Sequence, residues 1–189
     1  DPYGLIRLEG EPLPTLFELA AGEGVVHSSS FSKTVAPGVR VGYFVFPDRL
    51  GREIELLAAS TYITPVLLAE ATVYEFVRSG RFEPNLERVR ELLRARRDAM
   101  LDGLESHLRE SATWSKPEGG YFLWVDFPDS IAGSDVLERA TGAGVTFIAG
   151  TDFFPPGEGG AHSARLAFSY VSPAEISEGI TRLAAVQRW

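Results

Sequence analysis

Lys33 stands in a polar, glycine-containing segment between two apolar runs. Val25 and Val26 precede the segment and residues 43–46 follow it, so it is predicted to join two strands and to lie at their ends. A lysine amine whose surroundings lower its pKa is a nucleophile that forms a Schiff base with an aldehyde or ketone. Lys33 is therefore a candidate covalent amine, and the structural alternative is a solvated lysine in an ordinary surface loop.

The same segment contains groups that suit a phosphate. Arg40 carries a planar guanidinium, which binds a phosphate through two parallel hydrogen bonds. The hydroxyls of Ser30 and Ser32 could donate to the same oxygens, while Pro37 stiffens the chain between the lysine and the arginine. The segment thus places a candidate phosphate site beside a candidate covalent amine.

The order of these residues resembles the cofactor-lysine signature of fold type I pyridoxal-phosphate enzymes. The motif is Ser-Phe-Ser-Lys at residues 30–33, followed by Ala-Pro-Gly-Val-Arg-Val-Gly-Tyr at residues 36–43. It is most similar to the class I/II aminotransferases, in the branch with 2-aminoadipate and kynurenine aminotransferases. By this resemblance, Lys33 forms the internal aldimine with pyridoxal 5'-phosphate, while Ser30 and Arg40 hold the cofactor phosphate.

The first residues of the chain resemble a second family segment. Residues 1–4 are similar to the Asp-Asp-Pro-Tyr stretch, in which a tyrosine hydroxyl reaches the ring oxygen of the cofactor, a role that falls to Tyr3. The family's aspartate at the pyridine nitrogen stands three residues before that tyrosine, whereas Asp1 stands two before it. The carboxylate that keeps the ring nitrogen protonated is therefore expected upstream of residue 1.

A third segment resembles the family strand that carries the substrate-carboxylate arginine. Residues 162–169 contain Arg-Leu-x-Phe-Ser, which gives that role to Arg165. A guanidinium suits a carboxylate because two charge-assisted hydrogen bonds set position and orientation together. The structural alternative is an arginine on the polar face of an edge strand. Residues 119–122 also resemble a family segment near the substrate, although an aromatic cluster is more often core.

The resemblance covers the whole chain of 189 residues but only about the second half of a complete enzyme. It implies an α/β fold made of the C-terminal part of a fold type I large domain, residues 1–79, and a long interdomain helix with the small α+β C-terminal domain, residues 80–189. The other half supplies the glycine-rich phosphate turn and the aromatic ring that stacks on the cofactor. The 189 residues alone are therefore expected to be inactive.

Hydrophobic periodicity predicts the elements that position these residues. Helical spacing extends over residues 50–59, 66–77 and 84–107, residues 121–127 are predicted to be a strand, and residues 173–186 a closing helix. Ser134 is expected to cap a short helix that ends at Thr141, and residues 145–148 are expected to form a short strand. The basic run at residues 94–97 is interpreted as the solvated face of the long helix.

Composition argues against several kinds of partner and site, namely nucleic acid, metal ions and a membrane. The net charge of −8 argues against a nucleic-acid surface in this portion. The absence of cysteine from the sequence excludes disulfides and thiolate metal sites, and His107 and His162 lack the paired spacing of a metal site, so no metal is expected. No run of about 18 apolar residues predicts a membrane span, and no signal peptide opens the chain, so a cytoplasmic location is expected.

Two functions from different classes remain open at this point. The first is a pyridoxal-phosphate-dependent aminotransferase that moves an amino group between an amino acid and a 2-oxo acid, as a homodimer. The second is an aminotransferase-like effector domain of a transcriptional regulator, whose DNA-binding module would precede residue 1. A third possibility is a non-catalytic fragment that is stable only against a partner chain, which would show an exposed apolar face.

Overall fold

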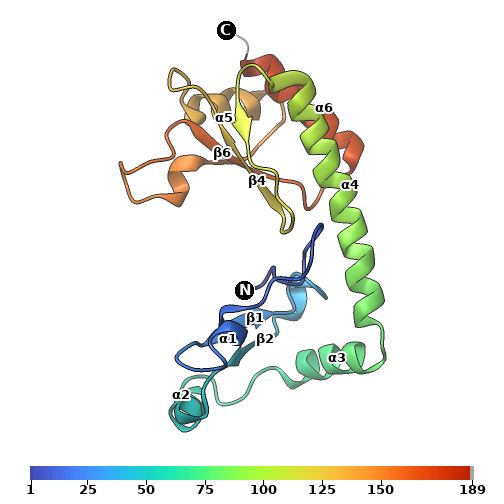
Figure 1. The fold of residues 1–189 in the computed structure, drawn as a ribbon, viewed down its shortest axis with the longest axis vertical. Coiled ribbons are helices and arrows are strands. Elements are labelled where there is room, and N and C mark those ends of the chain that lie inside the picture. Colours follow the sequence, from blue (N-terminus) through green and yellow to red (C-terminus); the bar gives the residue numbers. More distant parts are fainter. Residues whose placement is uncertain (188–189) are drawn as a thin grey trace. The chain divides into compact units, whose positions relative to one another are not determined.

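The computed structural model describes residues 1–187. The chain forms two compact units, Asp1–Arg90 and Glu91–Trp189, and Figure 1 traces its elements in order. The boundary between the units falls inside the long helix α4 (Phe82–Leu108). The expected domain division after residue 79 stays a prediction, and each unit is described by itself.

The first unit contains the strand pair that was predicted on either side of Lys33. Strand β1 (His27–Ser30) pairs antiparallel with β2 (Gly42–Val45), so that His27 faces Val45 and Ser30 faces Gly42. Short helical turns precede and follow the strands. They are α1 (Leu16–Leu19), η1 (Pro37–Val39) and η2 (Asp48–Leu50). A capping box between Thr15 and Glu18 forms the N-terminus of α1.

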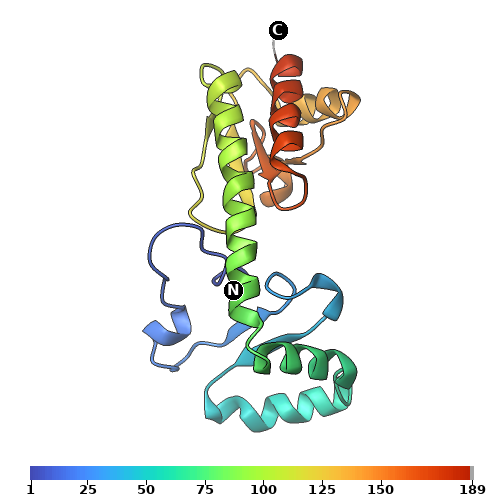
Figure 2. The ribbon, with the colours of Figure 1, turned by 90° about the vertical axis from the view of Figure 1, so that its right-hand side faces the viewer.

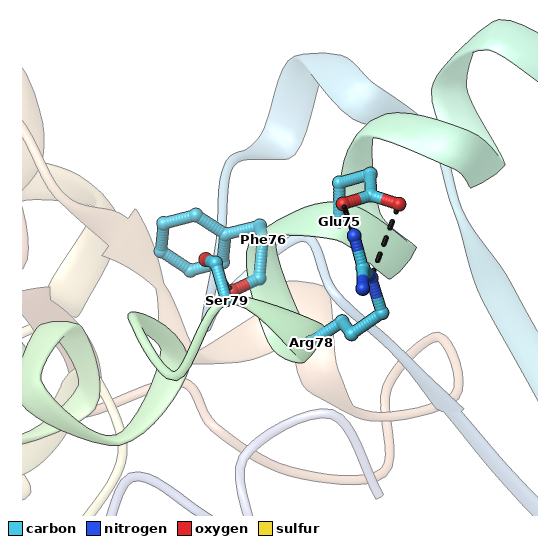
Figure 3. A network of polar contacts seen from close by, with 4 residues as sticks. All are labelled: Glu75, Phe76, Arg78 and Ser79. Atoms are coloured by element: carbon cyan, nitrogen blue, oxygen red, sulfur yellow. Dashed lines mark hydrogen bonds and ion pairs between the residues drawn. The ribbon is translucent and has the colours of Figure 1, made fainter.

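Two of the predicted helices belong to this unit. Helix α2 (Gly51–Thr61) and helix α3 (Leu67–Arg78) lie within two residues of the predicted bounds and follow one another before α4 begins (Figure 2). At the end of α3, Arg78 and Glu75 form an ion pair of 2.8 Å, and the Ser79 hydroxyl donates to the Phe76 carbonyl (Figure 3). An exposed pair of this kind contributes less than about 1 kcal/mol. The helix ends because Gly80 takes a φ of 75°.

The first unit has little apolar core of its own. Among its described large apolar side chains, the buried ones are Ile6, Leu8, Val73 and Leu86. Many others are exposed, and they include Leu13, Leu16, Phe44, Leu56, Leu57, Ile63, Val66, Leu67, Leu68 and Tyr74. Because so small a core cannot offset the conformational entropy of ordering this much chain, we expect this unit to bury its apolar surface against further polypeptide.

Helix α4 confirms the predicted long amphipathic helix. Its buried positions, Leu86, Leu93, Arg97, Met100, Leu104 and Leu108, recur at intervals of three, four or seven residues. The interpretation of the basic run as a solvated face is wrong for Arg97, which is only 4% exposed. Its guanidinium pairs with Asp98 at 2.6 Å and donates to the Pro117 carbonyl at 3.1 Å, which satisfies the buried charge.

The second unit is built on a four-stranded antiparallel sheet in the order β3-β4-β6-β5. The strands are β3 (Thr113–Trp114), β4 (Phe122–Asp126), β5 (Ile148–Ala149) and β6 (Ser163–Ala167). One face is buried, with Leu123 and Val125 of β4 beside Ala164 and Leu166 of β6. Because side chains alternate along a strand, Phe122, Trp124 and Arg165 lie on the other face.

Two helices of the second unit complete this core, α5 (Gly133–Gly142) and α6 (Pro173–Gln187). Helix α6 runs beside the C-terminal half of α4 (Figure 2), where a Cβ added at Gly103 would lie 3.2 Å from the Ile180 side chain. At the start of α6, the Ser172 hydroxyl and backbone N–H donate to Glu175 and lower the pKa of its carboxyl. This capping interaction is therefore present at neutral pH and is lost as the pH falls through that lowered pKa.

Two predicted details of the second unit are wrong. Ser134 does not cap α5, because Ala132 precedes the helix and no side chain caps its N-terminus. The strand expected at residues 145–148 is Ile148–Ala149 instead. The Val145 N–H donates to the Ala140 carbonyl at 2.8 Å across Gly144, whose φ is 78°, so Val145 closes the helix end and is not free to enter a ladder.

Across residues 1–187, no helix is both long enough and apolar enough to cross a membrane. Within the same residues, no group of three or more histidine, aspartate or glutamate side chains could hold a metal ion.

Gly160 provides a test of how the second unit is packed, because a Cβ there would lie 2.3 Å from the backbone carbon of Gly150. We expect Gly160→Ala to reduce the free energy of unfolding by about 2 kcal/mol or more. Gly157→Ala is the matched control, because Gly157 also has a positive φ but nothing lies within 4 Å of its added Cβ. The Gly157→Ala variant should lose about 1 kcal/mol of the free energy of unfolding, because alanine at a positive φ is strained. Urea titration of tryptophan fluorescence measures both, and equal losses would contradict this close approach.

Candidate functional site

Strand pairing closes the segment that carries Lys33. Ser30 faces Gly42 across the ladder, and the Phe31 N–H donates to the Val41 carbonyl at 3.0 Å. Within the closed segment, the Phe31 carbonyl accepts hydrogen bonds from the N–H groups of residues 34, 35 and 36, at 2.8 to 3.3 Å. Lys33 therefore lies in a compact, hydrogen-bonded turn, and the prediction of a loop between two strands is confirmed.

Helix α4 anchors this turn through residues that the sequence analysis did not single out. Asn85 Nδ2 donates to the Thr34 carbonyl at 2.8 Å, and Thr34 is buried. The Phe31 ring contacts the Tyr43 ring, with centroids 5.7 Å apart, and meets the Phe82 ring edge-on at 6.3 Å. In the sequence, the one indication of this packing is Phe31, because an aromatic side chain between two serines is expected to contact other apolar groups.

Tyr3 and Lys33, far apart in sequence, are brought together. The Lys33 Nζ atom lies 5.7 Å from the centroid of the Tyr3 ring. The first residues of the chain are fixed along β1, because the Ser29 hydroxyl donates to the Asp1 carbonyl at 2.8 Å and the Asp1 amino group donates to the Ser28 carbonyl. A phenol and an amine thus lie at the same end of the strand pair.

The two predicted phosphate ligands stand at the two ends of the lysine turn. Ser30 is the last residue of β1, and its hydroxyl has no hydrogen-bond partner within residues 1–187. Arg40 follows η1 in the left-handed region, with a φ of 53° and a ψ of 35°. Its exposed guanidinium donates through Nη1 to the Pro37 carbonyl at 3.1 Å. A non-glycine residue held in this strained conformation is more frequent at functional sites than elsewhere.

Arg165 occupies an interior position of the second unit's sheet. It lies in β6 between Trp124 of β4 and Ile148 of β5, so the alternative of an edge-strand arginine is wrong. The guanidinium carbon lies 3.9 Å from the Phe122 ring centroid and 4.4 Å from that of Phe153. Its Nε atom is buried, and the structure shows no hydrogen-bond partner for it among the described residues.

Helix α4 also fixes the chain that follows the Arg165 strand. Arg96 Nη1 donates to the Ser169 carbonyl at 2.7 Å, and Nη2 donates to the Tyr170 carbonyl at 2.8 Å. The sequence alone gives this basic run no role, because a cluster of arginines on a helix does not reveal which of them point inward. Arg96, which is partly buried, therefore joins the segment after β6 to α4.

Comparison with protein-family models shows which family the chain belongs to. The family model described as aspartate aminotransferase matches residues 54–188, which is more than half of the chain. The chain belongs to the aspartate aminotransferase family. The resemblance to fold type I aminotransferases that was stated from the lysine motif is thereby confirmed.

Individual relatives agree with this assignment. The aromatic-amino-acid aminotransferase 1 of Thermococcus litoralis is 33% identical over 97% of this chain and 44% of its own length. The solved structure of LysN, the α-aminoadipate aminotransferase of Thermus thermophilus, superposes with a TM-score of 0.90 and 31% identity, over 98% of this chain and 48% of that one. The chain thus spans about half the length of these relatives, and the predicted α/β fold is confirmed.

A relative from another functional class is also similar. The HTH-type transcriptional regulator TauR of Rhodobacter capsulatus is 33% identical over 93% of this chain and 36% of its own length. Family membership alone therefore does not separate an enzyme from a regulator.

The bond from Asn85 to Thr34 gives a test of how the lysine turn is held. Replacing Asn85 with alanine should leave the Thr34 carbonyl without this donor and destabilise the turn by about 1 kcal/mol. Amide hydrogen exchange at residues 34–36 should then accelerate about fivefold. Glu87→Ala, at an exposed position in the same helical turn, is the control and should leave these rates unchanged. Unchanged exchange in Asn85→Ala would show that strand pairing alone holds the turn.

Proposed function

We propose that the full-length protein is a pyridoxal-phosphate-dependent aminotransferase that acts on amino acids and 2-oxo acids. One observation carries the proposal: the Lys33 amine and the Tyr3 ring lie together, 5.7 Å apart, at the end of the strand pair. The backbone hydrogen bonds of the turn fix the chain on both sides of Lys33. A covalent amine requires such fixed geometry, because its reaction depends on its distance and orientation.

The groups at this site fit pyridoxal phosphate. An aldehyde requires an amine, which Lys33 provides, and the ring oxygen requires a donor, which the Tyr3 hydroxyl provides. A phosphate requires N–H and O–H donors at one place. The Ser30 hydroxyl has no partner within residues 1–187, and the exposed Arg40 guanidinium uses one N–H on the Pro37 carbonyl and keeps the others for an anion. LysN, solved with N-(5'-phosphopyridoxyl)-L-leucine, supports the same choice of cofactor.

Each residue then has a distinct task in the reaction. When bound, pyridoxal phosphate supplies the aldehyde that takes up the amino group and a ring that withdraws electrons. Lys33 would hold that aldehyde through its Nζ atom, and the free Nζ atom would accept and return the proton at the substrate Cα atom. Tyr3 would donate to the ring oxygen, Ser30 and Arg40 would hold the phosphate, and Arg165 would orient the substrate through its carboxylate.

We further propose a homodimer in the cytoplasm. Many large apolar side chains of residues 1–90 are exposed, including Leu67, Leu68 and Ile63, and surface of this kind is typically covered in the functional assembly. The rest of the polypeptide and a second subunit would both contribute to covering it.

The alternative function is the effector domain of a DNA-binding regulator, which the similarity to TauR favours. The two functions differ in what precedes residue 1. An enzyme requires a carboxylate at the pyridine nitrogen and a cofactor-stacking aromatic, whereas a regulator requires a helix-turn-helix module. Sequencing the gene upstream of this segment decides between them. Arg165 with its empty hydrogen-bonding edge favours the enzyme, because a sensor of the cofactor alone has no need of a carboxylate site.

Lys33→Ala tests the covalent role, and the sequence offers a matched control because Lys116 is the other of its two lysines. In the full-length protein, Lys33→Ala should slow transamination by several orders of magnitude, since it removes both the covalent amine and the proton carrier. Borohydride reduction with pyridoxal phosphate should label the Lys33 peptide in the wild type and in Lys116→Ala, and this label should be lost in Lys33→Ala. Labelling confined to Lys116 would contradict the assignment.

Arg165→Ala tests the carboxylate role. The variant should lose about 2–4 kcal/mol of transition-state binding with an amino acid, because a desolvated bidentate ion pair is removed. The matching amine, which lacks the carboxylate, should lose much less. Steady-state kinetics with both donors measures the difference, and equal losses would show that Arg165 does not bind the carboxylate.

A further inference from the structure

The Arg165 guanidinium lies against two aromatic rings from different parts of the second unit. Phe122 stands in β4, diagonal to Arg165 across the ladder, and Phe153 ends η3 (Gly150–Phe153). The guanidinium carbon is over both rings, at 3.9 and 4.4 Å from their centroids. Two aromatic faces, one from a strand and one from a loop, therefore hold the same cation.

The aromatic contacts fix Arg165 without using its hydrogen-bond donors. Within residues 1–187, the Arg165 side chain makes no hydrogen bond and no ion pair, and its Nε atom is buried without a partner. An Asp or Glu side chain in place of the rings would also orient the guanidinium, but it would neutralise the charge of Arg165 and occupy its N–H groups. A ring face attracts the cation through its quadrupole and leaves the N–H edge open.

The exposed Phe153 ring also contacts Trp124. The Trp124 ring, directly across the ladder from Arg165, meets the Phe153 ring edge-on at 5.5 Å. Trp124 Nε1 donates to Asp126 Oδ1 at 2.8 Å, and the same oxygen accepts the Ser163 hydroxyl at 2.7 Å. This chain of contacts runs along the open face of the sheet and sets the position of Trp124.

The loop that carries Phe153 is closed at its base by glycines. A Cβ at Gly150 would lie 2.6 Å from the Gly160 carbonyl oxygen and 2.6 Å from the Ser163 Cβ, so the two ends of the loop touch each other and the start of β6. The Ser163 N–H also donates to the Gly160 carbonyl at 3.2 Å. The loop that carries Phe153 is thus attached to Ser163, two residues before Arg165 in β6. This attachment limits how far the ring can move relative to the guanidinium.

We propose that Phe122 and Phe153 form an aromatic clamp that positions the Arg165 guanidinium for the substrate carboxylate. The inference rests on the proposed function, because it takes the carboxylate as the ligand of Arg165. Phe122 and Phe153 are positioning residues in this account, since they act through the arginine. The clamp holds the plane of the guanidinium and keeps its full charge and its N–H edge for a carboxylate, so it contributes to the preference for an acid over a neutral group.

Ring-deleting variants of the full-length enzyme test the clamp. Phe153→Leu and Phe122→Leu remove a ring and keep apolar volume, and Phe153→Tyr keeps the ring face. Phe154→Leu is the matched control, because Phe154 is as exposed as Phe153 and contacts Trp124 but makes no contact with Arg165. The two ring deletions should raise KM for the best amino-acid donor about tenfold and change it less than about twofold for the matching amine. Phe153→Tyr and Phe154→Leu should behave like the wild type.

A binding measurement that needs no turnover gives the second readout. Calorimetry with 3-phenylpropanoate and its neutral counterpart 3-phenylpropanamide should show about tenfold weaker binding of the acid to the two ring-deleting variants and unchanged binding of the amide. Equal weakening of both ligands would overturn the clamp and show a role in apolar packing alone. A Phe153→Tyr variant as impaired as Phe153→Leu would overturn it as well.

Arg165→Ala in the same series distinguishes failure of the clamp from failure of the carboxylate role. If Arg165→Ala removes the preference for the acid while both ring-deleting variants keep it, the clamp fails and the proposed carboxylate role stands. If Arg165→Ala keeps the preference, the carboxylate role itself is wrong, and the clamp falls with it. Loss of the preference in Arg165→Ala and in the two ring deletions supports both.

Discussion

The pairing of β1 with β2 is the constraint on which the proposed cofactor site depends. Because Ser30 pairs with Gly42 across the ladder, the residues between them form a closed turn. This turn fixes the backbone at Lys33, and Arg40 lies at its C-terminal end. Gly42 suits this close pairing, because a Cβ there would lie 3.1 Å from the Ser29 carbonyl oxygen, closer than ordinary van der Waals contact. A residue whose chemistry depends on its distance from a cofactor ring requires such a fixed frame, and hydrogen bonds between backbones provide it independently of side-chain motion.

The elements were largely predictable from sequence, for local reasons, and the roles of the candidate residues stay predictions. Long periodic stretches such as residues 84–107 and the alternation in residues 121–127 specify helix and strand through their own spacing, and the lysine motif is long enough to be specific. What surrounds these residues was not predictable. Asn85 and Phe153 act on groups far from them in sequence, so nothing in their neighbourhood predicts that they hold Thr34 and Arg165.

The errors share one cause, which is that local patterns do not report tertiary partners. Ser134 has the residue type of a helix cap, yet the helix begins before it. Arg97 belongs to a charged run on a helix, yet its partners at Asp98 and Pro117 offset the desolvation of a buried guanidinium.

A crystal structure of the full-length protein grown with pyridoxal phosphate tests the central claim most directly. The account predicts continuous electron density from Lys33 Nζ to the cofactor, the Tyr3 hydroxyl beside the ring oxygen, and the phosphate against Ser30 and Arg40. Cofactor density joined to Lys116, or a phosphate bound away from both Ser30 and Arg40, would contradict it.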